Sequence, residues 1–177
     1  MSTKLKWGLI TGAVYVIFSL ISNLLGLQEG GGFTATAVLS NTLLFGVTLF
    51  TIYSGVKESR VQNENGYLTF GQGFRTGMGI SLISALIVFV FTIIYLYLID
   101  PGMIDKVMEM TEESWDKQGM PEDQKEVVRK YTMMFMTPWA FSLIAIVSCI
   151  FWGLIKSLIS AAILKKEGPP SVPTTTE

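Results

Sequence analysis

The chain has 177 residues, of which 50% are hydrophobic and 15% are charged, and its formal net charge is −1. It contains no histidine, which excludes Ser/His and Cys/His catalysis and most zinc sites. No cluster of Lys and Arg with interleaved aromatic residues is present, so nucleic acid is not expected as a partner.

Charged residues are absent from four long segments of the chain, residues 7–28, 30–56, 76–99 and 131–155. Each segment is long enough for a helix to cross about 30 Å of hydrocarbon, which takes about 20 residues. Strands of a membrane barrel would be about ten residues long and would alternate polar with apolar residues. We therefore predict an all-α fold, a four-transmembrane-helix bundle within a single domain, residues 1–167. The expected spans are 7–27, 33–53, 76–99 and 138–164.

The first span follows Lys4 and Lys6 and is too long for an ordinary signal peptide, so we expect an uncleaved helix. The glycine-rich residues 28–32 predict a tight link to the second span, and residues 63–66 predict a turn. Thr69 and Gln72 fit a capping box, which predicts that the third helix begins near Phe70.

Residues 100–136 form the largest segment outside the expected spans. Apolar residues recur there at helical spacing, first over 104–115 and then over 127–135, with Gly119 and Pro121 between them as a helix end and a helix start. We expect an extramembrane hairpin of two amphipathic helices. Its predicted partner contacts are Val107, Met108, Trp115, Val128 and Tyr131. Thr137 and Pro138 predict the start of the fourth spanning helix, and the Pro- and Thr-rich tail 168–177 is expected to be disordered.

Basic residues predict the orientation. Eight would lie on the side of the two termini: Lys4, Lys6, Lys57, Arg60, Arg75, Lys156, Lys165 and Lys166. The hairpin has five basic residues and nine acidic ones. The positive-inside rule then predicts a multi-pass membrane protein with both termini in the cytoplasm. Tyr95, Tyr97 and Trp139 are expected at the outer membrane boundary.

Polar residues inside the expected spans are few. Lys156 is expected to extend its ammonium group to the membrane surface beside the cytoplasm. Asn23 and Asn41 lie at similar depth and are expected either to hydrogen-bond across the first two helices or to line a polar pocket. No Asp or Glu lies inside an expected span, which argues against a proton-coupled pump.

Small residues recur four apart in three of the expected helices, a pattern that lets helix backbones approach closely. The predicted helix-packing residues are Gly8, Gly12, Gly73, Gly77, Ser81, Ala85, Gly153 and Ser157. They would pack within the monomer or, alternatively, against a partner.

We expect no catalytic residues, no metal and no cofactor. Glu109, Glu112, Glu113 and Asp116 share a helix face that could hold Ca²⁺ or a basic partner, although a solvated face is the simpler interpretation. Seven of the nine Met residues lie between Met103 and Met136, which fits helix packing better than a copper(I) site. Cys149 is expected to be a small buried apolar residue.

Three sequence stretches carry a resemblance to a known family: residues 66–74, residues 99–101 and residues 116–124. Over residues 5–165 the chain resembles domain-of-unknown-function family 4199, small bacterial inner-membrane proteins. The family has no established activity, so the resemblance implies no catalytic residue. It implies a polyprenyl-phosphate glycosyltransferase as one possible partner.

These observations lead us to expect a non-enzymatic accessory subunit of a larger membrane complex, in contact with lipid and with another membrane protein or a second copy of itself. The alternative is a small transporter or lipid-handling protein acting as a homo-oligomer, which needs a polar cavity near Asn23 and Asn41. A membrane enzyme that uses the acidic residues of the hairpin is a third possibility.

Overall fold

The structure is a computed structural model that describes residues 2–26, 35–63 and 66–166. Within these ranges the elements are α1 (Thr3–Leu24), α2 (Ala35–Asn63), α3 (Phe70–Ile94), a π-helix η1 (Tyr95–Ile99), α4 (Met103–Lys117), α5 (Glu122–Phe135) and α6 (Pro138–Leu164). Four helices, with η1 extending α3, are long and apolar enough to cross a membrane. The predicted all-α fold, with four helices long and apolar enough to span a membrane, is confirmed for the described residues. The link at 28–32, the centre of the turn at 63–66 and the tail 168–177 lie outside the described residues.

Local capping sets the start of two spanning helices. The Thr69 hydroxyl accepts from the backbone N–H of Gln72, whose side chain in turn accepts from the backbone N–H of Thr69 at 2.8 Å. This capping box confirms that α3 begins at Phe70. The Thr137 hydroxyl caps α6 in the same way, by accepting from Ala140. In contrast, α2 continues about ten residues past the expected end at 53. The charged residues that follow the apolar segment are still helical.

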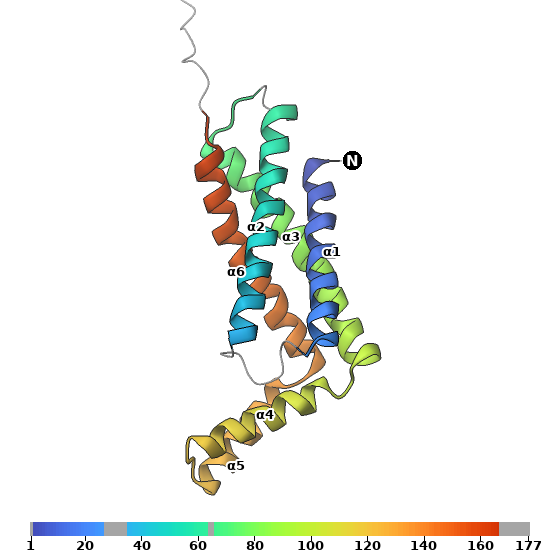
Figure 1. Ribbon diagram of the computed structural model, residues 1–177, viewed down its shortest axis with the longest axis vertical. Coiled ribbons are helices and arrows are strands. Elements are labelled where there is room, and N and C mark those ends of the chain that lie inside the picture. The colour runs from blue at the N-terminus through green and yellow to red at the C-terminus, as the bar shows by residue number, and fades with distance from the viewer. Residues whose placement is uncertain (1, 27–34, 64–65, 167–177) are drawn as a thin grey trace, which may run out of the picture.

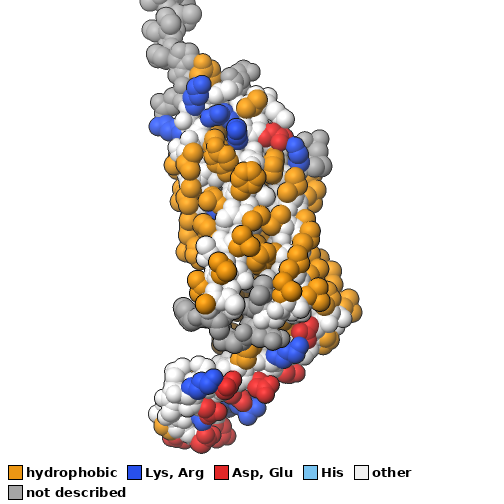
Figure 2. All heavy atoms as spheres, in the orientation of Figure 1, with side chains coloured by type: hydrophobic (Ala, Val, Ile, Leu, Met, Phe, Trp, Pro, Cys, Tyr) orange, Lys and Arg blue, Asp and Glu red, His pale blue; other side chains and the backbone are white. Residues whose placement is uncertain are grey.

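The four spanning helices run side by side, and α3 packs against α1, α2 and α6 (Figure 1). The first residue of α1, the last residue of α2, the first residue of α3 and the last residue of α6 share one end of the bundle, whereas α4 and α5 lie beyond the other end. We call the first the basic end, because it carries Lys4, Lys6, Lys57, Arg60, Arg75, Lys165 and Lys166. Figure 2 shows this cluster of basic side chains above a wide belt of hydrophobic ones.

The spanning helices place apolar side chains outward and small polar ones inward. Leu43, Phe50, Leu86 and Val147 are more than half exposed. Hydroxyl side chains fill much of the interior: Thr11, Thr48, Ser81, Ser84, Ser142 and Ser157 are all buried. Lipid tails solvate apolar side chains as well as a protein interior does, so this arrangement suits hydrocarbon and not water.

The half of the bundle near the basic end holds the apolar core. Ile52, Val56, Leu68, Ile80 and Leu164 are buried together, with Trp7 and Tyr53 packed against them. The Glu58 carboxylate accepts hydrogen bonds from Lys6 Nζ and from Trp7 Nε1, each at 2.9 Å. Arg60 donates to the carbonyl of Leu164 at 3.3 Å, which satisfies one of the acceptors left at the end of α6. These contacts join the helix ends through charged and polar groups.

Ion pairs link α4 to α5. Arg129 pairs with Glu112 at 2.8 Å, and Lys125 pairs with both Asp116 and Glu122. Between the helices Gly119 has a φ of 69°, which only glycine adopts readily. The predicted helix start at Pro121 is off by one residue, because Pro121 is the N-cap and Glu122 begins α5. That α4 and α5 form a hairpin outside the membrane stays a prediction.

Candidate functional site

The half of the bundle near α4 holds a cavity between the helices. Its volume is about 270 Å³, enough for about nine groups the size of a water molecule. The lining combines aliphatic and aromatic side chains with uncharged polar ones. It consists of Tyr15, Phe18, Ser19, Asn23, Asn41, Leu44, Val88, Phe91, Thr92, Tyr95, Leu96, Met103 and Phe141.

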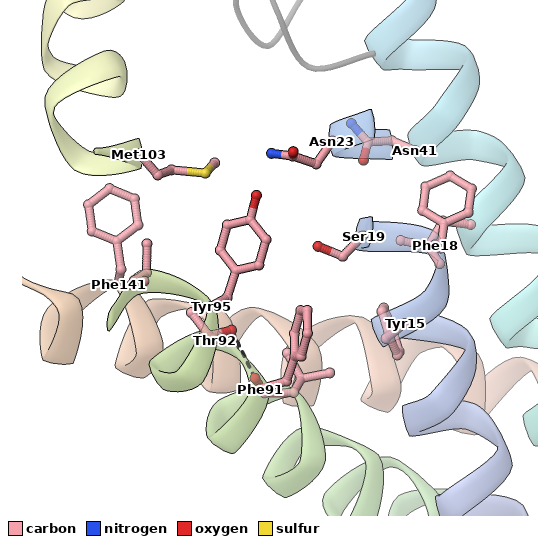
Figure 3. Close-up of a pocket in the computed structure, with 13 residues that line it drawn as sticks. Tyr15, Phe18, Ser19, Asn23, Asn41, Phe91, Thr92, Tyr95, Met103 and Phe141 are labelled. Carbon is pink, nitrogen blue, oxygen red and sulfur yellow. Dashed lines mark hydrogen bonds between the residues drawn. The ribbon is translucent and has the colours of Figure 1, made fainter. Parts of the chain in front are cut away.

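One edge of the cavity carries the two asparagines that the sequence singled out. Asn23 of α1 and Asn41 of α2 face the same space from neighbouring helices (Figure 3). Both side chains are exposed, so they lie at the open edge of the cavity and do not pack dry against each other. Tyr15, Ser19 and Asn23 follow at intervals of four residues, which places a polar stripe of α1 along the cavity wall.

Tyr95 supplies the most deeply buried polar group of the cavity. The residue is 6% exposed, and its hydroxyl has no hydrogen-bond partner among the described residues. Figure 3 shows the hydroxyl pointing into the space between Met103 and Asn23. The helix widens at this residue into the π-helix η1, in which the N–H of Asp100 bonds to the carbonyl of Tyr95 at 2.9 Å. Wide turns of this kind recur at functional sites.

A buried lysine lies below the floor of the cavity, on the side of the basic end. Lys156 of α6 is 2% exposed. Its Nζ donates to the Tyr15 hydroxyl at 3.0 Å and to Thr48 Oγ1 at 2.6 Å, and lies 4.9 Å from the centre of the Phe45 ring. The expectation that this side chain reaches the membrane surface is therefore wrong.

The geometry of α6 explains the direction of Lys156. Side chains on a helix tilt toward its N-terminus, which for α6 is the end away from the basic residues. Inside the bundle, the hydroxyls of Tyr15 and Thr48 accept hydrogen bonds from the Lys156 ammonium group. The Cys149 thiol is buried beside Ser84 and Tyr15, so helices α1, α2, α3 and α6 all contribute to one polar cluster.

The predicted helix-packing residues lie at contacts between helices of the same chain. A Cβ on Gly77 would lie 2.8 Å from Ser157 Cβ, and one on Gly153 would lie 2.5 Å from Ser81 Cβ, so α3 and α6 are in close contact there. Gly73 faces Ala161 across the same contact, and Ala85 of α3 is buried. Gly8 and Gly12 face Ile83 and Ile87 across the contact of α1 with α3. These faces are occupied within the monomer.

The predicted partner-contact residues differ in exposure: those on α4 are buried or partly buried, and those on α5 are exposed. Met108 of α4 is buried, and Val107 and Trp115 are partly buried. Val128 and Tyr131 of α5 are 36% and 61% exposed, and Val127, Met134 and Phe135 are exposed beside them. The apolar face of α5 is therefore open in the monomer. It carries no site by itself.

The remaining sequence candidates do not converge. No group of His, Cys, Asp or Glu that could hold a metal ion occurs among the described residues. Glu112, Glu113 and Asp116 each form an ion pair with a basic side chain. Met133 and Met134 are exposed on α5, apart from Met108. Nothing in this arrangement favours a copper or calcium site.

Sequence reasoning missed several residues of the cavity and the cluster below it. Tyr95 was expected at the membrane boundary, but the structure buries it. Tyr15, Ser19 and Thr48 were not singled out, although their hydroxyls line the cavity or bind Lys156. The four-residue spacing of Tyr15, Ser19 and Asn23 on an otherwise apolar helix was the available signal.

Comparison with known proteins yields one match. The family described as "Protein of unknown function (DUF4199)" matches residues 6–166, most of the chain, and this confirms the resemblance noted from the sequence. No curated protein and no solved structure matches the chain.

Proposed function

Because the chain belongs to DUF4199, a family without an assigned activity, we propose its function from the cavity: a non-enzymatic membrane protein that binds the polar part of a lipid-like molecule between its helices. The observation that carries this proposal is the buried Tyr95 hydroxyl, which has no partner among the described residues and lies in a cavity edged by Asn23 and Asn41. A buried polar group without a partner costs about 1–3 kcal/mol, and a ligand that bonds to it recovers that cost.

The composition of the lining indicates the kind of ligand. Phe18, Phe91 and Phe141 provide apolar contact, and the asparagine amides and tyrosine hydroxyl donate and accept hydrogen bonds. A molecule with a polar group and a hydrocarbon part matches both. The exposed apolar surface of the spanning helices indicates that such molecules surround the protein.

Retention of a ligand through purification tests this proposal. We expect the protein, purified in a mild detergent and measured by native mass spectrometry, to carry a lipid-sized molecule at a ratio near one per chain. Replacing both Asn23 and Asn41 by Leu should lower that ratio several-fold. Thr42→Val is the matched control, because the Thr42 hydroxyl bonds to the Val38 carbonyl of its own helix and does not line the cavity. Equal retention by all three proteins would contradict the proposal.

A second candidate function, an accessory subunit of a membrane complex, has support from the exposed apolar face of α5. The small-residue ladders give it none, since they pack within the monomer. Affinity purification with mass spectrometry should then recover a stoichiometric membrane protein that Val128→Asp and Tyr131→Asp release. Recovery of a polyprenyl-phosphate glycosyltransferase or of a second copy of the chain would identify the partner. If both variants still recover the same partner, α5 does not bind it.

We place the protein in a bacterial inner membrane with the basic end in the cytoplasm and α4 and α5 outside. Seven basic residues at the basic end support this orientation, one fewer than the sequence suggested, because Lys156 lies inside the bundle. The native cysteine, Cys149, is buried, so single cysteines can report sidedness. A membrane-impermeant maleimide added to spheroplasts should label Glu126→Cys and not Ser2→Cys. The reverse result would invert the topology.

A further inference from the structure

We infer that the ligand of the cavity carries an anionic group, a phosphate or a carboxylate, selected by the positive charge of Lys156 below the cavity floor. This inference rests on the proposed function, since it assumes that the cavity binds a ligand. It names the charge of that ligand, which the uncharged lining alone does not indicate.

The first step is the distance between the lysine and the cavity. Leu44 lines the cavity, and Thr48 lies one helical turn further along α2, about 5 Å. The Thr48 hydroxyl bonds both to the Leu44 carbonyl, at 2.7 Å, and to Lys156 Nζ, at 2.6 Å. Tyr15 also belongs to both sites, because its ring lines the cavity and its hydroxyl accepts from Nζ. A single layer of side chains therefore separates the ammonium group from the ligand space.

The second step is the charge state of the surroundings. Lys156 contacts two hydroxyls and the faces of Phe45 and Tyr15, and aromatic faces favour a cation. No Asp or Glu lines the cavity, and no salt bridge to Lys156 occurs in the part of the chain that the structure describes. The positive charge is therefore not cancelled by a carboxylate at short range.

The third step is Asp100, an acidic residue directly after the π-helix η1, which helps to line the cavity. Asp100 follows Tyr95 by one π-helical turn and would repel an anion, but Lys106 donates to its carboxylate oxygens at 3.0 and 3.3 Å. Lys106 therefore offsets part of the repulsion from Asp100, and Lys156 adds a positive field from the other side of the cavity. In a medium of low polarity this field acts over the thickness of one side chain with little screening. An anion in the cavity is attracted, and a cationic group is repelled.

The test compares two lipids that differ in charge. Protein in dodecyl maltoside is incubated with equal amounts of phosphatidylglycerol and phosphatidylcholine of matched acyl chains, and the bound lipids are counted by native mass spectrometry. We expect the wild type to prefer phosphatidylglycerol about tenfold, which corresponds to about 1.4 kcal/mol. Lys156→Met should bring the ratio close to one, and Lys156→Arg, which keeps the charge, should restore part of the preference.

A second variant keeps the test decisive if Lys156→Met does not fold. Asn41→Asp adds a negative charge at the open edge of the cavity, where the side chain is exposed, and should also abolish the preference. A third arm adds inorganic phosphate to protein that has been loaded with phosphatidylglycerol. Phosphate that displaces bound phosphatidylglycerol would identify the free anion as sufficient, whereas no displacement would identify the lipid headgroup as the source of the charge.

The failures of the two proposals are distinguishable. Equal retention of both lipids by the wild type would overturn the anion inference and leave lipid binding intact. A preference for phosphatidylglycerol that persists in Lys156→Met would also overturn the anion inference and leave lipid binding intact. Retention of neither lipid by the wild type would overturn the proposed function itself.

Discussion

The two halves of the bundle use the same four helices but fill the space between them differently. Near the basic end, Gly8, Gly77 and Gly153 let the backbones approach until no Cβ fits between them. Near α4, Phe18, Phe91 and Phe141 face the same interior and enclose a cavity. Small contact residues bring membrane helices together, and large ones hold them apart. We therefore expect substitutions in the first half to affect stability and substitutions in the second half to affect ligand binding.

The largest expected effect comes from overfilling the tightly packed half. Gly77→Leu places a side chain where even a Cβ lies 2.8 Å from Ser157, and should destabilise the fold by about 3 kcal/mol. Gly46→Leu is the control, because no atom lies within 4 Å of a Cβ at that position. Thermal unfolding in detergent measures both. Similar melting temperatures for the two variants would remove the distinction between the two halves.

Removing volume from the same half should have the next largest effect. Ile80→Ala deletes a side chain that is 0% exposed and should cost about 2 kcal/mol. On the same helix Leu86 is 59% exposed, and Leu86→Ala should change stability by less than about 0.5 kcal/mol. Chemical unfolding of the two variants in the same detergent provides the comparison. A larger loss for Leu86→Ala would mean that its outward face is buried against another chain.

In the cavity half, a substitution should affect binding more than stability. Tyr95→Phe removes a hydroxyl that has no partner among the described residues, so the melting temperature should stay within about 1 °C or rise slightly. Retention of the bound molecule should fall several-fold. Thr42→Val serves as the control, because the Thr42 hydroxyl bonds to the Val38 carbonyl of its own helix and lies outside the cavity lining. A marked loss of stability in Tyr95→Phe would instead assign the hydroxyl a structural role.

The smallest effect is expected beyond the cavity half, at the link between α4 and α5. Hydrogen bonds to Asp116 and Glu122 raise the pKa of Lys125 above its ordinary value of 10.5. Because the folded-state pKa is raised, the stabilisation is fully present below pH 10.5 and is lost as the pH rises through the higher, folded value. The fluorescence of Trp115, which precedes Asp116 on α4, should shift as the pH rises above 10.5. Lys125→Met should abolish the shift, and its persistence would assign it to another group.

The sequence was informative for features that a short local pattern determines, such as the extent of a helix, its first residue and its packing face. Uncharged length predicted the four spans, and local hydrogen bonding at Thr69 and Thr137 predicted the first residues of α3 and α6. The small-residue spacing predicted which faces pack. These features depend on a helix and its nearest neighbour, so they can be read without knowing the rest of the fold.

The cavity could be predicted only in part, because it depends on how four helices are rotated against one another. Asn23 and Asn41 stood out as amides in apolar segments. Tyr95 did not, since its position along the chain fits a membrane boundary equally well until its face is known. Lys156 was placed at the wrong depth for a related reason: distance from the helix end suggested the surface, but the tilt of the side chain leads inward.

The inward direction of Lys156 also has a consequence for the order of biosynthesis. A lysine in the middle of a helix makes insertion into the membrane less favourable by about 2.5–3.5 kcal/mol. The groups that receive its ammonium, Tyr15, Phe45 and Thr48, belong to α1 and α2, which leave the ribosome before α6. We therefore expect α6 to enter a membrane that already holds the polar partners of Lys156, so that the insertion of α6 is coupled to its packing against α1 and α2.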